Sequence, residues 1–403
     1  MSRLAIVSPR FGPGITGGAE KLARDIGMRL AARGHEITVL TTCAEDYVTW
    51  ADVLPAGESR DGPLRVVRFP VRAPRDLARW EAAMQPLLAG RWTGADEERV
   101  LREAGPDAPA VLDHLREHGD GYQAVIFFTL LYLPTVAGVP LVWDRAIVVP
   151  LLHEELAAHL NAQGRALRLA REVIWNTPEE RALAEHLHDV EGLRGAVCGV
   201  GVEVPPGTDP ERARTRFGLE RPYLLYAGRI DRDKGCTELI ENFTAWAQRD
   251  DRADLVLAGK AWMPLPEHPR IRHLGVVEQA ELWDLLAGAT ATAIPSRRES
   301  LSMLALESLA CGVPILVPSG SPVLEGHVRR SSAGLVHGDA ADFAAAGQLL
   351  LDDAQTRREL GRNGQRYVAA NYTWERIEAL YERAIATACR RPATSGRTIP
   401  PRP

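Results

Sequence analysis

Residues 291–318, ATAIPSRRESLSMLALESLACGVPILVP, predict a strand, a loop, a helix, a turn and a second strand. Two acidic residues mark this stretch: Glu299 in the predicted loop and Glu307 inside the predicted helix, eight positions later. The helix is expected to begin near Ser302 and Met303. Its first amide N–H groups have no partner within the helix and its dipole is positive there, so this end favours an anion. The stretch therefore predicts an anion site beside two carboxylates.

The two carboxylates can converge on one ligand, because Glu299 lies in the loop that precedes the helix. The alternative is that Glu299 is a capping acid and Glu307 a solvated helix residue. That alternative suits Glu307 poorly, since its neighbours in LALESLA are almost all apolar and a carboxylate among them needs a polar partner.

The rest of the chain alternates between strand and helix patterns twice over. Residues 3–8, RLAIVS, predict a buried strand; a glycine-rich loop, a helix from Ala19 to Arg33 and the strand 35–41, HEITVLT, follow. The alternation restarts at 223 with YLLYAGRI and GCTELIENFTAWAQR. Such βαβ order predicts parallel, doubly wound sheets and an α/β fold class.

Domain boundaries are expected where proline and charge accumulate. The segment 203–222, EVPPGTDPERARTRFGLERP, has the composition of an interdomain connector. We therefore expect an N-terminal domain over residues 1–203 and a C-terminal domain over 204–370. A last helix is expected over 371–389, and the proline-rich end, 390–403, is predicted to be disordered.

Composition excludes several classes of protein. The chain has 403 residues, 45% of them hydrophobic and 25% charged, with a net charge of −5. That charge provides no global basic field to attract nucleic acid. The five cysteines form no CxxC pair and lie near no histidine cluster, so no metal site is predicted and a reducing cytoplasm fits best. No stretch approaches eighteen apolar residues, which predicts a soluble protein, with attachment to a membrane surface left open.

A second candidate motif is YAGRIDRDKG at 226–235. Gly228 ends a predicted strand, Arg229 follows at once and Lys234 comes five residues later. Ligands of parallel α/β sheets bind beyond the carboxyl ends of the strands, so both cations are aimed at a ligand. Together they could neutralise a diphosphate without a metal. For a single cation a solvated surface position would be the better interpretation.

Two further features carry weaker signals. Gly17 and Gly18 in TGGAE stand between a strand and a helix, where the backbone can approach a ligand closely. The motif is neither GxGxxG nor a P-loop, and a plain tight turn explains it as well. His153 follows a strand in LLHEE, but a lone histidine is more often structural than catalytic.

These motifs resemble those of a known family. ESLSMLALE is similar to the Glu-x7-Glu element of the retaining glycosyltransferases of family 4, and YAGRIDRDKG is similar to their diphosphate-binding strand end. The resemblance runs from Leu4 to about Ala388. It implies the GT-B fold, in which two Rossmann-like domains face each other across a cleft. A last helix, here within NYTWERIEALYERAI, crosses back onto the N-terminal domain.

The resemblance also implies a role for each residue. The C-terminal domain would bind a nucleotide sugar and the N-terminal domain most of the acceptor. Arg229 and Lys234, at the strand end marked by Gly228, would hold the diphosphate; Glu307 would bind the ribose and Glu299 the transferred sugar. The remaining donor contacts would come from backbone amides near Leu301, Ser302 and Met303, from backbone groups at Val276 and Val277 beside the base, from Gly17 and Gly18, and from His153 near the reacting centre.

The sequence departs from the family pattern in places. Ser300 and Ser302 replace glycines, which puts the form of the sugar pocket in doubt, and Glu154 stands where an aspartate often follows the histidine. The insertion 72–120 matches no motif and is expected to form part of the acceptor side. Its arginines and tryptophans could lie on a lipid surface, although a solvated helix face is the simpler interpretation.

The expected activity is retaining, front-face sugar transfer from a nucleoside-diphosphate sugar to a hydroxyl of a small molecule, glycan or lipid. The leaving diphosphate would take the acceptor proton, with His153, Glu299, Arg229 and Lys234 as the catalytic set. No metal or other cofactor is expected. A nucleotide-sugar epimerase or hydrolase of the same fold is the alternative enzyme, and a non-catalytic nucleotide-sugar-binding partner is the alternative outside catalysis.

Overall fold

The computed structural model describes residues 1–15, 17–190 and 192–390. The chain divides into two compact units. The first comprises Met1–Gly199 and the chain from Ile377 on, and the second comprises Val200–Arg376. The predicted disordered tail, 390–403, lies outside the described residues except for Arg390.

Within the described residues, the first unit contains an eight-stranded sheet in the order β3-β4-β2-β1-β5-β6-β7-β8. Its strands are β1 (Arg3–Val7), β2 (Glu36–Thr42), β3 (Gly57–Asp61), β4 (Leu64–Phe69), β5 (Ala124–Phe128), β6 (Ala146–Val149), β7 (Glu172–Trp175) and β8 (Gly195–Val197). All neighbours pair in parallel except β3 with β4. The strand order reverses between β1 and β5, and ligands of such sheets bind at that reversal.

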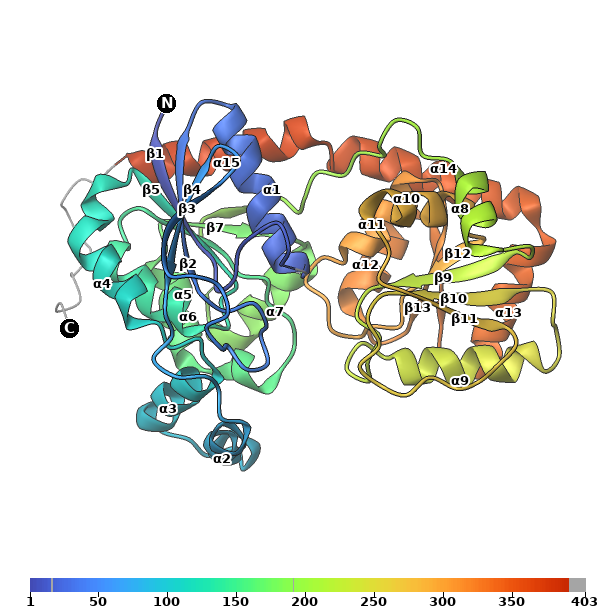
Figure 1. Cartoon of the computed structure of the whole chain (residues 1–403), viewed down its shortest axis with the longest axis horizontal. Helices are drawn as coiled ribbons and strands as arrows, with labels where there is room; N and C mark the ends of the chain where they lie inside the picture. The colour runs from blue at the N-terminus through green and yellow to red at the C-terminus, as the bar shows by residue number, and fades with distance from the viewer. Residues whose placement is uncertain (16, 191, 391–403) are drawn as a thin grey trace. The chain divides into compact units, whose positions relative to one another are not determined.

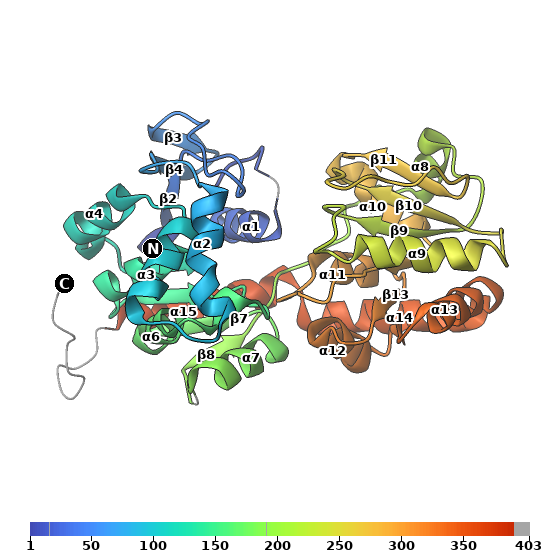
Figure 2. The same cartoon turned by 90° about the horizontal axis from the view of Figure 1, so that it is seen from below.

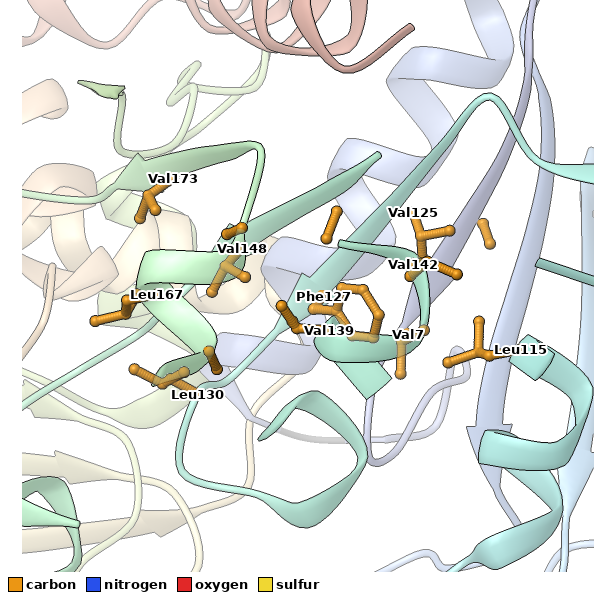
Figure 3. Close-up of a cluster of buried hydrophobic side chains, with 14 of the residues drawn as sticks. Val7, Leu115, Val125, Phe127, Leu130, Val139, Val142, Val148, Leu167 and Val173 are labelled. Atoms are coloured by element: carbon orange, nitrogen blue, oxygen red, sulfur yellow. The ribbon is translucent and has the colours of Figure 1, made fainter. Parts of the chain in front are cut away.

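Buried side chains on one face of the strands pack against the helices that cover that face. Val125 and Phe127 of β5 pack with Leu115 and Leu167 from two of these helices (Figure 3). The helices are α1 (Gly18–Ala32), α2 (Leu77–Leu88), α3 (Gly94–Ala104), α4 (Pro109–His118), α5 (Leu133–Gly138), α6 (Asn161–Leu169) and α7 (Pro178–His188). All five residues of β5, AVIFF, are buried, and such a continuous apolar run is typical of a strand covered on both faces.

The insertion 72–120 is mostly helical. Two of its helices, α2 and α3, pack on each other (Figure 2). Their shared apolar cluster includes Ala83, Leu87 and Val100 and continues onto Leu160 before α6. The insertion is therefore anchored to the first unit by its own small core.

The second unit contains, among its described residues, a six-stranded parallel sheet in the order β11-β10-β9-β12-β13-β14. Its strands are β9 (Tyr223–Ala227), β10 (Asp254–Ala258), β11 (Ile271–Gly275), β12 (Ala291–Ala293), β13 (Ile315–Pro318) and β14 (Gly334–His337). The order reverses between β9 and β12, which pair through Ala291 and Leu224. The expected ligand position of this unit is therefore the carboxyl end of those two strands.

Helices cover both faces of the second sheet (Figures 1 and 2). On one face, Phe243 and Trp246 of α9 meet Phe343 of α13. On the other, Ala213 of α8 meets Trp283 and Leu286 of α10. The helices of this unit are α8 (Pro210–Phe217), α9 (Cys236–Ala247), α10 (Gln279–Gly288), α11 (Met303–Ala310), α12 (Pro322–Ser331), α13 (Ala340–Asp352) and α14 (Ala354–Asn371).

The last helix, α15 (Trp374–Cys389), returns to the first unit. Tyr381 is fully buried there, and Glu378 and Glu382 form ion pairs with Arg33 at the end of α1. Figure 1 shows this red helix beside β1, β5 and α1. The predicted fold class, two Rossmann-like doubly wound units with a final helix that crosses back to the first, is confirmed.

The described helices and acidic, histidine and cysteine side chains bear on membrane crossing and metal binding. None of the described helices is long and apolar enough to cross a membrane. The described residues also contain no group of three or more His, Cys, Asp or Glu side chains that could hold a metal ion.

Candidate active site

The residues predicted to hold a diphosphate lie at the strand reversal of the second unit. Arg229 follows β9, and Lys234 lies in the turn that leads into α9. Glu299 lies in the loop after β12, the strand beside β9. Lys234 Nζ donates a hydrogen bond to Glu299 Oε1 at 2.8 Å. The structure therefore brings one predicted cation and one predicted carboxylate into direct contact.

The second predicted cation is also paired with an acid. Arg229 forms an ion pair with Asp231, whose Oδ1 accepts a hydrogen bond from the Lys234 amide at 2.8 Å. The Tyr226 hydroxyl donates to the Arg229 carbonyl at 2.7 Å. Asp231 thus holds the Arg229 side chain and the Lys234 backbone, and nothing in the spacing of YAGRIDRDKG singles it out.

Glycines allow the strand ends to approach one another at this site. Gly259 follows β10 with a φ of 135°, and a Cβ there would lie 1.9 Å from the carbonyl oxygen of Gly228. A Cβ on Gly235, in the turn before α9, would lie 2.5 Å from the carbonyl oxygen of Pro295. No side chain fits at either position, so the loops after β9, β10 and β12 form one closely packed backbone surface.

Helix α11 begins at Met303, where the sequence predicts it. Ser302 is the residue before the helix and has a left-handed conformation, φ 65° and ψ 85°, which costs a non-glycine residue energy. The buried Ser308 hydroxyl bonds to Thr292 Oγ1 of β12 at 2.7 Å, so helix and strand are locked together. The first amides of α11 therefore have a fixed position relative to β12.

Glu307 lies on α11 and is only 6% exposed, as its apolar sequence neighbours predict. Burial, with a smaller contribution from the negative charge of Glu307, raises the pKa of the Cys311 thiol to about 12.

Val276 and Val277 follow β11, and Val276 is 74% exposed. The predicted base-binding position thus presents an apolar side chain to solvent at the strand next to β10.

In the first unit, Gly17 and Gly18 form the start of α1, as expected. A Cβ on Gly17, whose φ is 151°, would lie 2.0 Å from Glu20 Oε2. Arg10 is buried and donates to Glu20 from Nε at 3.0 Å and to the Glu45 carbonyl at 2.9 Å. Arg10 and Glu20 belong to no common motif, so their pairing cannot be predicted from the sequence.

His153 lies after β6, in a loop with an unusual backbone. Leu151 has a φ of 53°, and the Leu152 amide donates to Glu180 Oε1 of α7 at 2.7 Å. His153 Nδ1 lies 3.8 Å from Glu155 Oε1. Glu154, which stands where an aspartate often follows this histidine, accepts a hydrogen bond from His159 at 2.7 Å.

Tyr132 is a tyrosine of the first unit whose pKa is influenced by the nearby charges of Glu20 and Glu155. Burial, with a smaller contribution from the charge of Glu20, raises the pKa of Tyr132 to about 12. Its ring packs edge-on against Trp50, with the centroids 5.1 Å apart. The hydroxyl of Tyr132 therefore stays neutral at physiological pH.

Comparison with known proteins identifies the second unit. Residues 208–367 match the model of the family "Glycosyl transferases group 1". This range includes every predicted donor-binding residue of the second unit. A curated relative is the D-inositol 3-phosphate glycosyltransferase of Geodermatophilus obscurus. It is 26% identical over 431 residues, an alignment that covers 96% of this chain and 89% of the relative.

Solved structures share the fold of the whole chain. Sucrose-phosphate synthase from Thermosynechococcus elongatus matches with a TM-score of 0.71 and 21% identity, covering 96% of this chain and all of that one. An Anabaena protein in complex with UDP and glucose matches with a TM-score of 0.68 and 16% identity, over 96% of this chain and 100% of that one. The family match to residues 208–367 and the similarity to the curated relative support a glycosyltransferase, and the shared architecture shows the GT-B fold.

Proposed function

We propose that this enzyme transfers a sugar from a nucleoside-diphosphate sugar to an acceptor hydroxyl, with retention of the anomeric configuration. The observation that carries the proposal is the contact between Lys234 and Glu299. A cation for phosphate oxygens and a carboxylate for sugar hydroxyls meet at the strand reversal. That is the chemistry needed on the two sides of the bond between a sugar and a diphosphate.

In this proposal the diphosphate binds Arg229, Lys234 and the amides at the start of α11. Arg229 contributes a planar fork of donors and Lys234 a compact charge. Both cations are already held by carboxylates, Asp231 and Glu299, so their positions are set before the donor arrives. Groups fixed in this way stabilise the charge that develops on the leaving diphosphate.

The carboxylates bind hydroxyl groups. Glu307 accepts hydrogen bonds from the ribose, and Glu299 accepts them from the transferred sugar while it remains beside Lys234. The bond between the anomeric carbon and the diphosphate oxygen breaks as the acceptor oxygen bonds to that carbon on the same face. The acceptor proton passes to the departing diphosphate oxygen, so neither a protein nucleophile nor a metal ion is needed.

The first unit serves the acceptor. His153 and the glycine turn at Gly17 and Gly18 are the groups of this unit that we assign to the reacting centre. The insertion 72–120 carries an independent apolar cluster and is the candidate determinant of acceptor choice. The Anabaena structure of the same fold was solved with UDP and glucose, which makes UDP-glucose the first donor to test.

The test is a transfer assay with UDP-, GDP- and dTDP-sugars and a panel of phosphorylated polyols, sugars and lipids. The product is analysed by proton NMR for the configuration of the new glycosidic bond, with and without a chelator. An inverted product would contradict the retaining assignment, and loss of activity with the chelator would contradict the metal-free one. Donor breakdown without any acceptor would identify an epimerase or hydrolase, and binding without turnover would identify a non-catalytic partner.

A further inference from the structure

A buried histidine that no motif identifies lies directly behind the start of α11. His327 belongs to α12 and is fully buried. Its Nε2 lies 2.7 Å from the Leu301 carbonyl oxygen, and its Nδ1 lies 3.0 Å from the Tyr367 hydroxyl of α14. A carbonyl oxygen can only accept, so Nε2 carries the proton. In the neutral ring Nδ1 is then an acceptor, and Tyr367 donates to it.

The direction of the remaining hydrogen bonds follows from this assignment. Because Tyr367 donates its proton to His327, its oxygen is free to accept from other groups. Tyr372 lies 3.1 Å away through its own hydroxyl, and Arg330 Nε lies 3.3 Å away and can only donate. A continuous relay therefore runs from Tyr372 through Tyr367 and His327 to the Leu301 carbonyl.

The far end of the relay is tied to backbone. The Tyr372 carbonyl accepts a hydrogen bond from the Val202 amide at 2.8 Å, and a Cβ on the adjacent Gly201 would lie only 2.2 Å from the Trp374 ring. Val202 and Tyr372 lie close to the two points at which the chain passes between its units. The relay thus starts from a segment that packing and hydrogen bonding hold in place.

The near end of the relay fixes a peptide group of the proposed donor site. A trans peptide is planar, with its C=O and its N–H on opposite sides. When His327 holds the Leu301 carbonyl oxygen, the amide N–H of Ser302 must point away from His327. Ser302 also has a left-handed φ of 65°, which the chain does not favour on its own. An external hydrogen bond at this peptide therefore selects its orientation.

We propose that His327 is a positioning residue for sugar transfer: it aims the Ser302 amide at the donor, and Tyr367 and Tyr372 hold the imidazole in the required tautomer. This inference rests on the proposed function, because it assigns that amide to the leaving diphosphate or the sugar. His327 itself touches neither substrate. Its contribution comes through the Leu301–Ser302 peptide, and a misplacement of about 1 Å near the reacting atoms can reduce a rate about a hundredfold.

The experiment compares His327→Ala, His327→Gln and Tyr367→Phe with the wild type. We expect His327→Ala to lower kcat by about a hundredfold, with a smaller change in KM for the donor. Gln keeps an N–H donor for the Leu301 carbonyl and should recover most of the lost kcat. Tyr367→Phe leaves Nδ1 without its donor and should lower kcat about tenfold. Tyr381→Phe, the same change at a fully buried tyrosine of the first unit, is the matched control and should retain wild-type kcat.

Hydrogen exchange provides a readout that does not depend on activity. In the unliganded protein, His327→Ala and Tyr367→Phe should speed exchange in peptides that span 299–306, and Tyr381→Phe should not. Wild-type kcat in a folded His327→Ala protein, or no rescue by Gln, would overturn the proposal. If the wild type transfers no sugar, the proposed function fails, while the exchange rates still report whether the relay holds the peptide.

Discussion

Lys234 Nζ and Glu299 Oε1 lie 2.8 Å apart although 65 residues separate them in the chain. The contact joins the loops after two adjacent parallel strands, at the point where the strand order of the second unit reverses. In the proposed function the lysine binds the diphosphate and the carboxylate binds the sugar. Before the donor binds, each of the two side chains holds the other in place.

Replacing Lys234 by alanine should lower kcat with saturating donor by about a hundredfold to a thousandfold, the usual loss when one fixed donor to a developing anion is removed. The variant also leaves Glu299 without its lysine, so donor binding should weaken. Steady-state kinetics over a donor titration separate the two effects. Lys21→Ala is the control, because Lys21 pairs with Asp25 on the surface of α1, and near-wild-type kcat is expected. A Lys234→Ala enzyme with normal turnover would remove Lys234 from the mechanism.

Replacing Ser302 by glycine should stabilise the protein by about 1 kcal/mol, because a left-handed φ costs glycine no steric energy. It should also change the ratio of kcat/KM values between sugars, since the residue lies at the proposed sugar pocket. Ser332→Gly is the matched control: Ser332 has a φ of 49° and ends α12. Thermal unfolding should show a similar gain for both variants, and a donor panel should show altered selectivity for Ser302→Gly alone.

Replacing Gly259 by alanine should disrupt the donor site. The added Cβ would lie 1.9 Å from the carbonyl oxygen of Gly228, so the ends of β9 and β10 would have to separate. Gly207→Ala is the control, since Gly207 also has a positive φ, 83°, but has no atom within 4 Å of an added Cβ. Nucleoside diphosphate binding measured by calorimetry should be lost in the first variant and kept in the second. Equal affinities would show that the clash is relieved without cost to the site.

Glu180 should make the stability of the protein depend on pH. Burial raises the pKa of this carboxyl from 4.5 to about 7, so between those values the folded protein holds a proton that the unfolded chain has released. The free energy of unfolding should therefore fall as pH rises through this window, by at most about 3 kcal/mol. Urea unfolding of Glu180→Gln at pH 5 and pH 8 should lack this part of the slope. Glu185→Gln, on the exposed side of α7, should keep it.

The sequence predicts well those features that depend on periodicity and on the rules of parallel sheets. The apolar runs at 3–8 and 223–227 locate β1 and β9, and the rule that ligands lie beyond strand ends correctly anticipates that Arg229, Lys234 and Glu299 gather at one edge. The buried position of Glu307 follows from its apolar neighbours. Each of these inferences combines a short sequence pattern with a general rule for parallel sheets or for burial.

The features that escape prediction depend on distance or on a weak pattern. Strand β3, GESRD, is polar and largely exposed, so it lacks the alternation that reveals a half-buried strand. Asp231 lies inside the motif YAGRIDRDKG, but only the geometry shows that its carboxylate pairs with Arg229. No motif predicts that His153 Nδ1 lies 3.8 Å from Glu155 Oε1. His327 and Tyr367 lie 40 residues apart, and no spacing rule links two such side chains.

The return of α15 to the first unit affects the order in which the protein can be built. Tyr381, fully buried, and Ile377, equally enclosed, are synthesised only after all of the second unit. The N-terminal half emerging from the ribosome therefore lacks these two side chains and exposes the surface that they cover in the complete chain. Its maturation awaits the end of translation, and a fragment that stops at Gly199 lacks part of its own interior.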